Sequence, residues 1–305
     1  RENRDVVRAM GFSVDWRREF YTTDLHPYYS KFIEWQYRVL EKKGRVRKGS
    51  HPVVWCPVCQ SPTGDHDRLI GEGVSPEEFI LVYFKVNDAY LAAATFRPET
   101  IFGATNIWVN PDAMYTYVRT GGKRLIVSRE AANKLREQLV DIEVNGEFAG
   151  RELLGKIAYA PLTGKPLPVL PARFVNPSLG TGVVYSVPSH APYDYAGLKE
   201  LKQRPEILRQ YGIDYSIVDK LEPISIIDTE GFPPHPAVDL VEKAGISDSL
   251  DPRLEELTKE VYGKEFYAGR LNEKCDEYEG INVAAARDMV RDRVISEGLG
   301  GLMYD

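Results

Sequence analysis

The sequence of 305 residues has no long hydrophobic run and few cysteines. No apolar stretch approaches the roughly 18 residues that a transmembrane helix needs, and the charged start, RENRD, lacks the apolar core of a signal peptide. Cys56, Cys59 and Cys275 are too few for a disulfide framework. We therefore expect a cytoplasmic protein without a membrane partner. Because the chain does not begin with Met, we also expect an excised fragment.

The sequence also lacks an excess of basic charge, since its formal net charge is −6. Proteins that enclose a nucleic acid over a wide surface usually carry a basic footprint. We therefore expect any RNA contact to be local, at a single-stranded end rather than along a duplex.

Strands and helices alternate irregularly along the chain. Residues 79–86 and 90–95 predict two strands around a turn, and residues 104–109 and 124–127 predict two more. Several further short strands are expected between 140 and 188. Beyond the N-terminal 50 residues, helices are expected over 129–139 capped by Ser128, from Pro252 to about Tyr262 after Asp251, and over 283–297.

Near the N-terminus, Tyr28, Phe32, Trp35 and Val39 form the apolar stripe of a helix that Thr23 or Asp24 would cap. The many strands and few helices favour a mixed α/β fold, a β-barrel-like domain with surrounding and flanking helices. We expect four parts, a helical connective segment (1–50), a Cys-x-x-Cys knuckle (51–73), the barrel-like domain (74–245) and a helical return segment (246–305).

Two strand ends carry the candidate chemistry. Residues 94–103 read ATFRPETIFG, and Pro98 stops the strand because proline cannot donate to a sheet. Thr100 follows within the turn, where its hydroxyl and γ-methyl on a stiff side chain would suit a pocket wall. A threonine in an ordinary β-turn is the alternative.

Residues 180–195 read GTGVVYSVPSHAPYDY, a strand that Pro188 ends. Asp194 beyond it would either cap a helix near Tyr195 or bind a substrate ammonium by a short charge-assisted contact. A triad of Ser189, His190 and Asp194 is disfavoured, since adjacent strand residues point to opposite faces. We expect a structural His190 rather than a catalytic base.

Cys56-x-x-Cys59 resembles half of a zinc ribbon, and a full site needs four ligands. Only Cys275, His51, His66, Asp65 and Asp67 are available to complete it. We expect a knuckle held by packing, with no metal.

The two strand-end segments, 94–103 and 180–195, resemble the two signatures of the editing domain of class I aminoacyl-tRNA synthetases for leucine, valine and isoleucine. The segments GFSVDWRREF (11–20), WCPVCQSPTGDHD (55–67), SVPSHAPYDY (186–195) and YEGINV (278–283) are similar to archaeal and eukaryotic leucyl-tRNA synthetases. The HIGH and KMSKS signatures of that family are absent, so we expect no amino-acid activation by this chain.

The resemblance implies a catalytic set and a substrate-binding set. Thr95, Thr100 and Asp194 are implied to be catalytic, with Thr100 excluding leucine and Asp194 holding the ammonium. The implied substrate-binding residues are Phe96, Arg97, Ser186, His190 and Tyr193. Phe96 departs from the bacterial pattern, which has a second threonine there.

The resemblance implies hydrolysis of norvaline or isoleucine from mischarged tRNA(Leu) without a cofactor. The implied partners are the tRNA(Leu) 3′ end and the rest of the synthetase, and we expect a monomer. Two alternatives remain, valyl-type clearance of threonine, and a non-catalytic module that binds the acceptor end of the tRNA.

Overall fold

The computed structural model describes residues 2–18, 21–22, 25–49, 51–56, 58–64, 66, 73–139 and 141–305. By its internal contacts the chain divides into two units, Arg1–Val53 and Val54–Asp305, and each is described by itself. The predicted caps Thr23 and Asp24, and the candidate ligands Asp65 and Asp67, lie outside the described residues. The four-part division of the chain stays a prediction.

The first unit contains the helices α1 (Glu2–Ala9) and α2 (Pro27–Lys42) and a 3₁₀ turn at Trp16–Arg18. The predicted apolar stripe lies on α2. The helix α2 begins after His26, whose ring accepts a hydrogen bond from the N–H of Tyr29. No helix in the described part of the chain is long and apolar enough to cross a membrane.

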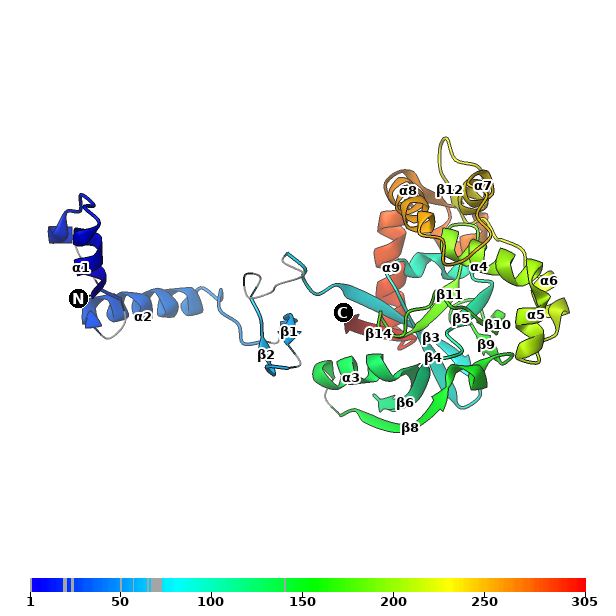
Figure 1. Cartoon of the computed structure of the whole chain (residues 1–305), viewed down its shortest axis with the longest axis horizontal. Helices are drawn as coiled ribbons and strands as arrows, with labels where there is room; N and C mark the ends of the chain where they lie inside the picture. Colours follow the sequence, from blue (N-terminus) through cyan, green and yellow to red (C-terminus); the bar gives the residue numbers. More distant parts are fainter. Residues whose placement is uncertain are drawn as a thin grey trace. The chain divides into compact units, whose positions relative to one another are not determined.

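The second unit is built on a large mixed sheet (Figure 1). The strand order is β11-β5-β10-β9-β3-β4-β7-β6-β8, with β14 beside β3. β10 runs parallel to β5 and β4 runs parallel to β7, while the other neighbours are antiparallel. The mixed α/β fold is confirmed, and the strands form an open path rather than a closed barrel.

The strands of this sheet are β3 (Glu78–Val86), β4 (Ala89–Thr95), β5 (Asn106–Val109), β6 (Met114–Thr120), β7 (Lys123–Ser128), β8 (Glu143–Ala149), β9 (Ile157–Tyr159), β10 (Pro166–Pro171), β11 (Val183–Ser186) and β14 (Gly300–Tyr304). Two small antiparallel pairs are β1 (Trp55–Cys56) with β2 (Ser61–Pro62), and β12 (Ile227–Asp228) with β13 (Arg270–Leu271).

The helices of this unit are α3 (Arg129–Gln138), α4 (Pro192–Gln203), α5 (Pro205–Gln210), α6 (Tyr215–Asp219), α7 (Pro236–Lys243), α8 (Arg253–Ala268) and α9 (Val283–Ser296). Short 3₁₀ helices are η4 (Pro98–Gly103), η5 (Gly150–Leu153) and η6 (Glu273–Tyr278). The predicted cap of α3 is confirmed, because the Ser128 hydroxyl accepts from the N–H of Ala131 at 3.1 Å.

The predicted helix α9 buries its apolar face, Val283, Ala286, Val290 and Val294, in the main core beneath the sheet. Three elements are among those that differ from the expectations. α8 continues six residues beyond the expected end at Tyr262, to Ala268, and β6 was not expected. The segment after α9 is a strand, β14, which pairs with the first half of β3 and so completes the sheet.

Candidate functional site

A cavity of about 550 Å³ lies where β4 and β11 end. The two candidate segments meet there. Thr95, Phe96, Arg97 and Thr100 come from the first, and His190, Tyr193 and Asp194 from the second, and all seven line the cavity. Ser186 does not line it. That side chain is fully buried at its sheet pairing with Asn106.

Asp194 lies in the first turn of α4 but does not cap that helix, which begins after Ala191. Its carboxylate instead accepts from the indole N–H of Trp108 at 3.1 Å and from the backbone N–H of Val187 at 2.7 Å. Burial raises the pKa of Asp194 to about 7, although both hydrogen bonds lower it. A buried carboxylate with such a pKa at a cavity wall is typical of a functional group.

The hydroxyl groups of Thr100 and Tyr185 meet at the backbone carbonyl of Arg97, at the start of η4. The Thr100 hydroxyl donates to the carbonyl of Arg97 at 2.7 Å and lies 3.0 Å from the hydroxyl of Tyr185. Tyr185, on β11, donates to the same carbonyl at 2.7 Å. Thr100 lines the cavity, and its hydroxyl is engaged by the carbonyl of Arg97.

Thr95 ends β4 and lies beside this group. Its hydroxyl oxygen accepts from the backbone N–H of Arg97 at 2.9 Å, which closes a short turn. The Thr95 side chain also hydrogen-bonds to the hydroxyl of Tyr185, and this bond lowers the pKa of Tyr185, which burial raises.

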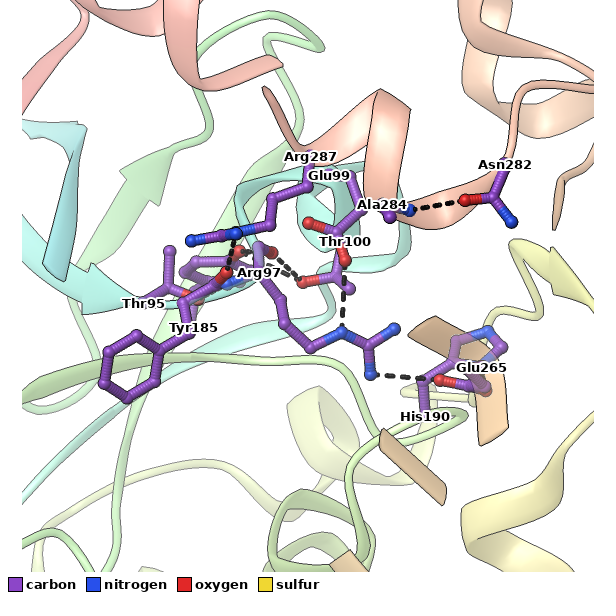
Figure 2. A network of polar contacts seen from close by, with 11 residues as sticks. Thr95, Arg97, Glu99, Thr100, Tyr185, His190, Glu265, Asn282, Ala284 and Arg287 are labelled. Carbon is purple, nitrogen blue, oxygen red and sulfur yellow. Dashed lines mark hydrogen bonds and ion pairs between the residues drawn. The ribbon is translucent and has the colours of Figure 1, made fainter. Parts of the chain in front are cut away.

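Arg97 forms the centre of a buried charge network (Figure 2). Its guanidinium contacts Glu99 at 3.1 Å and Glu265 at 3.0 Å, and it lies against the ring of Tyr262 at 4.6 Å. Burial alone would lower the pKa of Arg97, but the charges of Glu265 and Glu99 outweigh burial and raise it. Burial also raises the pKa of Glu99, which Arg97 partly offsets.

His190 joins the same network and is 1% exposed. Its Nε2 accepts the backbone N–H of Ile226 at 3.0 Å, so its Nδ1 carries the proton and donates to Glu265 at 2.6 Å. Ser189 instead contacts His235 at 2.9 Å. The Ser189, His190 and Asp194 side chains therefore have different partners, and the disfavoured triad is not formed. With both ring nitrogens occupied, His190 contributes to the wall as a structural group.

Glu265 is expected to stabilise the protein through this network. Replacing it with Ala removes a fully buried carboxylate from both Arg97 and His190. Breaking a buried pair by removing one partner costs about 3 kcal/mol or more. Urea unfolding should show that loss for Glu265→Ala. The exposed Glu260 of the same helix is the control, and Glu260→Ala should change the free energy of unfolding by less than about 0.5 kcal/mol. Equal losses for the two variants would refute the stabilising role.

Sequence reasoning missed the contribution of α8 to the site. Thr258 and Tyr262 line the cavity, and Glu265 holds Arg97. These residues are spaced by four and three, so they share one face of the helix. That spacing was the available signal, but nothing in the sequence says which side of the fold the face covers.

The Cys56 and Cys59 pair forms a local turn, in which the N–H of Cys59 lies 3.4 Å from the sulfur of Cys56. This hydrogen bond lowers the pKa of Cys56. Cys275 is buried in the core of the second unit. Within the described residues, no group of three or more His, Cys, Asp or Glu side chains is arranged to hold a metal ion.

Comparison with protein families gives two matches. The leucyl-tRNA synthetase editing domain matches residues 77–214, and the class I tRNA synthetases for isoleucine, leucine, methionine and valine match residues 1–109. The leucine–tRNA ligases of Methanothermobacter thermautotrophicus and Methanopyrus kandleri are 47% and 48% identical to this chain, over 100% of it and 32% of each relative. The chain thus spans about a third of the length of these relatives.

Solved structures agree with the fold. The crystal structure of GlLeuRS-CP1 matches with a TM-score of 0.66 and 27% identity, over 74% of this chain and 99% of that one. The P. knowlesi cytosolic leucyl-tRNA synthetase editing domain matches with a TM-score of 0.69 over 75% of this chain and 97% of that one. At 21% identity, this second likeness shows the fold alone.

The fold, the cavity and these matches define a protein of the class I aminoacyl-tRNA synthetases. Within that class the chain belongs to the leucyl-tRNA synthetase family, and residues 77–214 match the editing domain of that family.

Proposed function

We propose that this chain hydrolyses the ester that joins a wrong amino acid, norvaline or isoleucine, to the 3′ end of tRNA(Leu). The supporting observation is that Thr100 and Asp194, which are far apart in the sequence, line one cavity. A cavity of about 550 Å³ suits an aminoacyl nucleoside but not a folded acceptor stem.

In this scheme each wall of the cavity has a separate task. Asp194 binds the α-ammonium and thereby fixes the position of the ester carbonyl. Thr95 donates its hydroxyl proton toward the carbonyl oxygen or the attacking water. Thr100 meets the amino-acid side chain, and its methyl turns away the γ-branched leucine.

An editing pocket that is separate from the pocket that first selects the amino acid is useful. A single pocket separates side chains that differ by one methylene by only about 1–3 kcal/mol. Clearing errors at a pocket that sorts by exclusion multiplies the discrimination. The ester is already activated, so positioning of water and carbonyl accounts for the acceleration without a covalent nucleophile.

A deacylation panel tests the proposal. The chain is incubated with norvalyl-, isoleucyl-, threonyl- and leucyl-tRNA, and release of each amino acid is followed. We expect turnover of the first two and retention of leucine. Preferential release of threonine would favour the valyl-type alternative. Binding of tRNA without turnover of any substrate would favour a non-catalytic module.

A further inference from the structure

An exposed aromatic ring lies at the rim of the cavity. Phe96 follows the end of β4, is 42% exposed and lines the cavity. One face of its ring stacks on the buried Phe79, with ring centroids 4.1 Å apart and an interplanar angle of 29°. A ring held flat from behind offers its other face to a planar group, and every nucleobase has such a face.

An arginine is fixed to the same residue. Arg287 extends from α9, and its Nε donates to the backbone carbonyl of Phe96 at 3.0 Å. Within the described residues, no hydrogen bond or ion pair joins its two terminal nitrogens. The other arginines of α9 differ, since Arg291 pairs with Asp288 and Asp292, and Arg293 pairs with Glu277 and Glu297.

The charge around the cavity makes this cation significant. Arg97 is balanced by two carboxylates, Glu99 and Glu265, and the acids that line the cavity are Glu77 and Asp194. The positive charge of Arg287 acts to lower the pKa of Glu99. Glu99 is nevertheless fully buried, and the ion pair of its carboxylate is with Arg97. The lining thus offers phosphate no cation that is free of carboxylate partners, and the chain as a whole carries a net charge of −6. A phosphate that approaches this rim needs a local cation with unoccupied donors.

We propose that Arg287 and Phe96 form a clamp for the single-stranded RNA end outside the cavity. Arg287 binds the phosphate on the 5′ side of the terminal nucleoside, and Phe96 stacks on the neighbouring base. Arginine donors on phosphate and aromatic rings on bases are the two contacts by which proteins bind unpaired RNA. The inference rests on the proposed function, because the RNA end is the substrate of that reaction.

The test compares norvalyl-tRNA with the norvalyl ester of adenosine, which has neither the phosphate nor the neighbouring base. Arg287→Ala is expected to raise KM for norvalyl-tRNA about tenfold and to leave hydrolysis of the small ester unchanged. The dependence of log KM on log salt should weaken by about 0.7, the share of one phosphate on a single strand. Arg287→Lys keeps the charge and should keep the salt dependence.

Arg291→Ala is the matched control, one turn along the same helix with the same loss of charge. It should change neither KM nor the salt dependence. Phe96→Ala should raise KM for norvalyl-tRNA more than it raises KM for the small ester, and Phe96→Tyr, which keeps the ring, should have KM values close to those of the wild type.

Equal effects of Arg287→Ala on both substrates, or an equal effect of Arg291→Ala, would overturn the clamp. Should the wild-type chain hydrolyse nothing, the proposed function fails. The clamp is then judged by the dissociation constant of uncharged tRNA(Leu) and its salt dependence in the same variants. An Arg287→Ala variant that binds this tRNA as tightly as the wild type would exclude the clamp.

Discussion

Replacing Asp194 with Asn is expected to reduce kcat/KM for norvalyl-tRNA deacylation by about 100-fold or more. Removing one partner of a buried, hydrogen-bonded charge pair costs about 2–5 kcal/mol, and tenfold corresponds to about 1.4 kcal/mol. Asn has nearly the same shape as Asp, but its amide oxygen can accept from only one of Trp108 and Val187, and its NH2 group faces the other donor. The loss therefore combines the missing charge with one lost hydrogen bond, and a second substrate separates the two. The initial rate of norvaline release at low substrate concentration measures the loss.

The matched substrate control is N-acetyl-norvalyl-tRNA, in which the ammonium is absent. If Asp194 binds that ammonium, the wild type should hydrolyse the acetylated substrate poorly, and Asp194→Asn should lower this residual rate little further. If Asp194→Asn lost as much activity on the acetylated substrate as on the natural one, the proposed binding of the ammonium by Asp194 would be contradicted. Thermal unfolding of the variant checks that its fold is retained.

The pH profile gives an independent readout of the same residue. The Asp194 pKa of about 7 means that the free protein carries a substantial protonated fraction at neutral pH. Only the ionised form attracts an ammonium, so kcat/KM should rise with pH through about 7 and fall again as the substrate amine loses its proton. After subtraction of spontaneous ester hydrolysis, Asp194→Asn should lose the rising limb. An unchanged limb would assign the titration to another group.

The sequence predicts the parts of this fold whose signals are local. The strands on either side of the turn at Asn87 and Asp88, the Ser128 cap and the apolar face of α9 depend on residues a few positions apart. β14 escaped prediction because its partner, β3, begins more than 200 residues earlier, and a Gly-rich segment has little strand propensity of its own. Its position is decided by the unpaired edge of β3, which is a tertiary fact.

The difference between local signals and distant contacts also explains which parts of the site the sequence predicts. The stop signals at Pro98 and Pro188 mark two strand ends, and their convergence follows from β4 and β11 ending on one side of the fold. The partners of Asp194 and Arg97 could not be read from the chain. Trp108 precedes Asp194 by 86 residues, and Glu265 is far along the sequence from Arg97. A titratable residue acquires its role from such distant partners, and its spacing to near neighbours does not reveal them.

The second large effect is expected at Thr100, where Thr100→Ala should admit leucine. The side chain is 5% exposed and its hydroxyl donates to the carbonyl of Arg97, so in the proposed scheme the γ-methyl is the part that limits the space for a substrate branch. Removing that methyl should raise kcat/KM for leucyl-tRNA hydrolysis about 10- to 100-fold, because a steric difference of one methyl is worth about 1–3 kcal/mol. Hydrolysis of norvalyl-tRNA, whose side chain is unbranched, should change little.

Two further variants separate the methyl from the hydroxyl. Thr100→Ser keeps the hydroxyl bonds but loses the methyl, and should admit leucine as Ala does. Thr100→Val keeps the methyl and loses the hydroxyl, while the carbonyl of Arg97 still accepts from Tyr185 at 2.7 Å. We therefore expect Thr100→Val to go on excluding leucine. If the Thr100→Val variant released leucine and the Thr100→Ser variant did not, the hydroxyl, through its bond to the carbonyl of Arg97, would set the position of the wall. The methyl would then not form the gate.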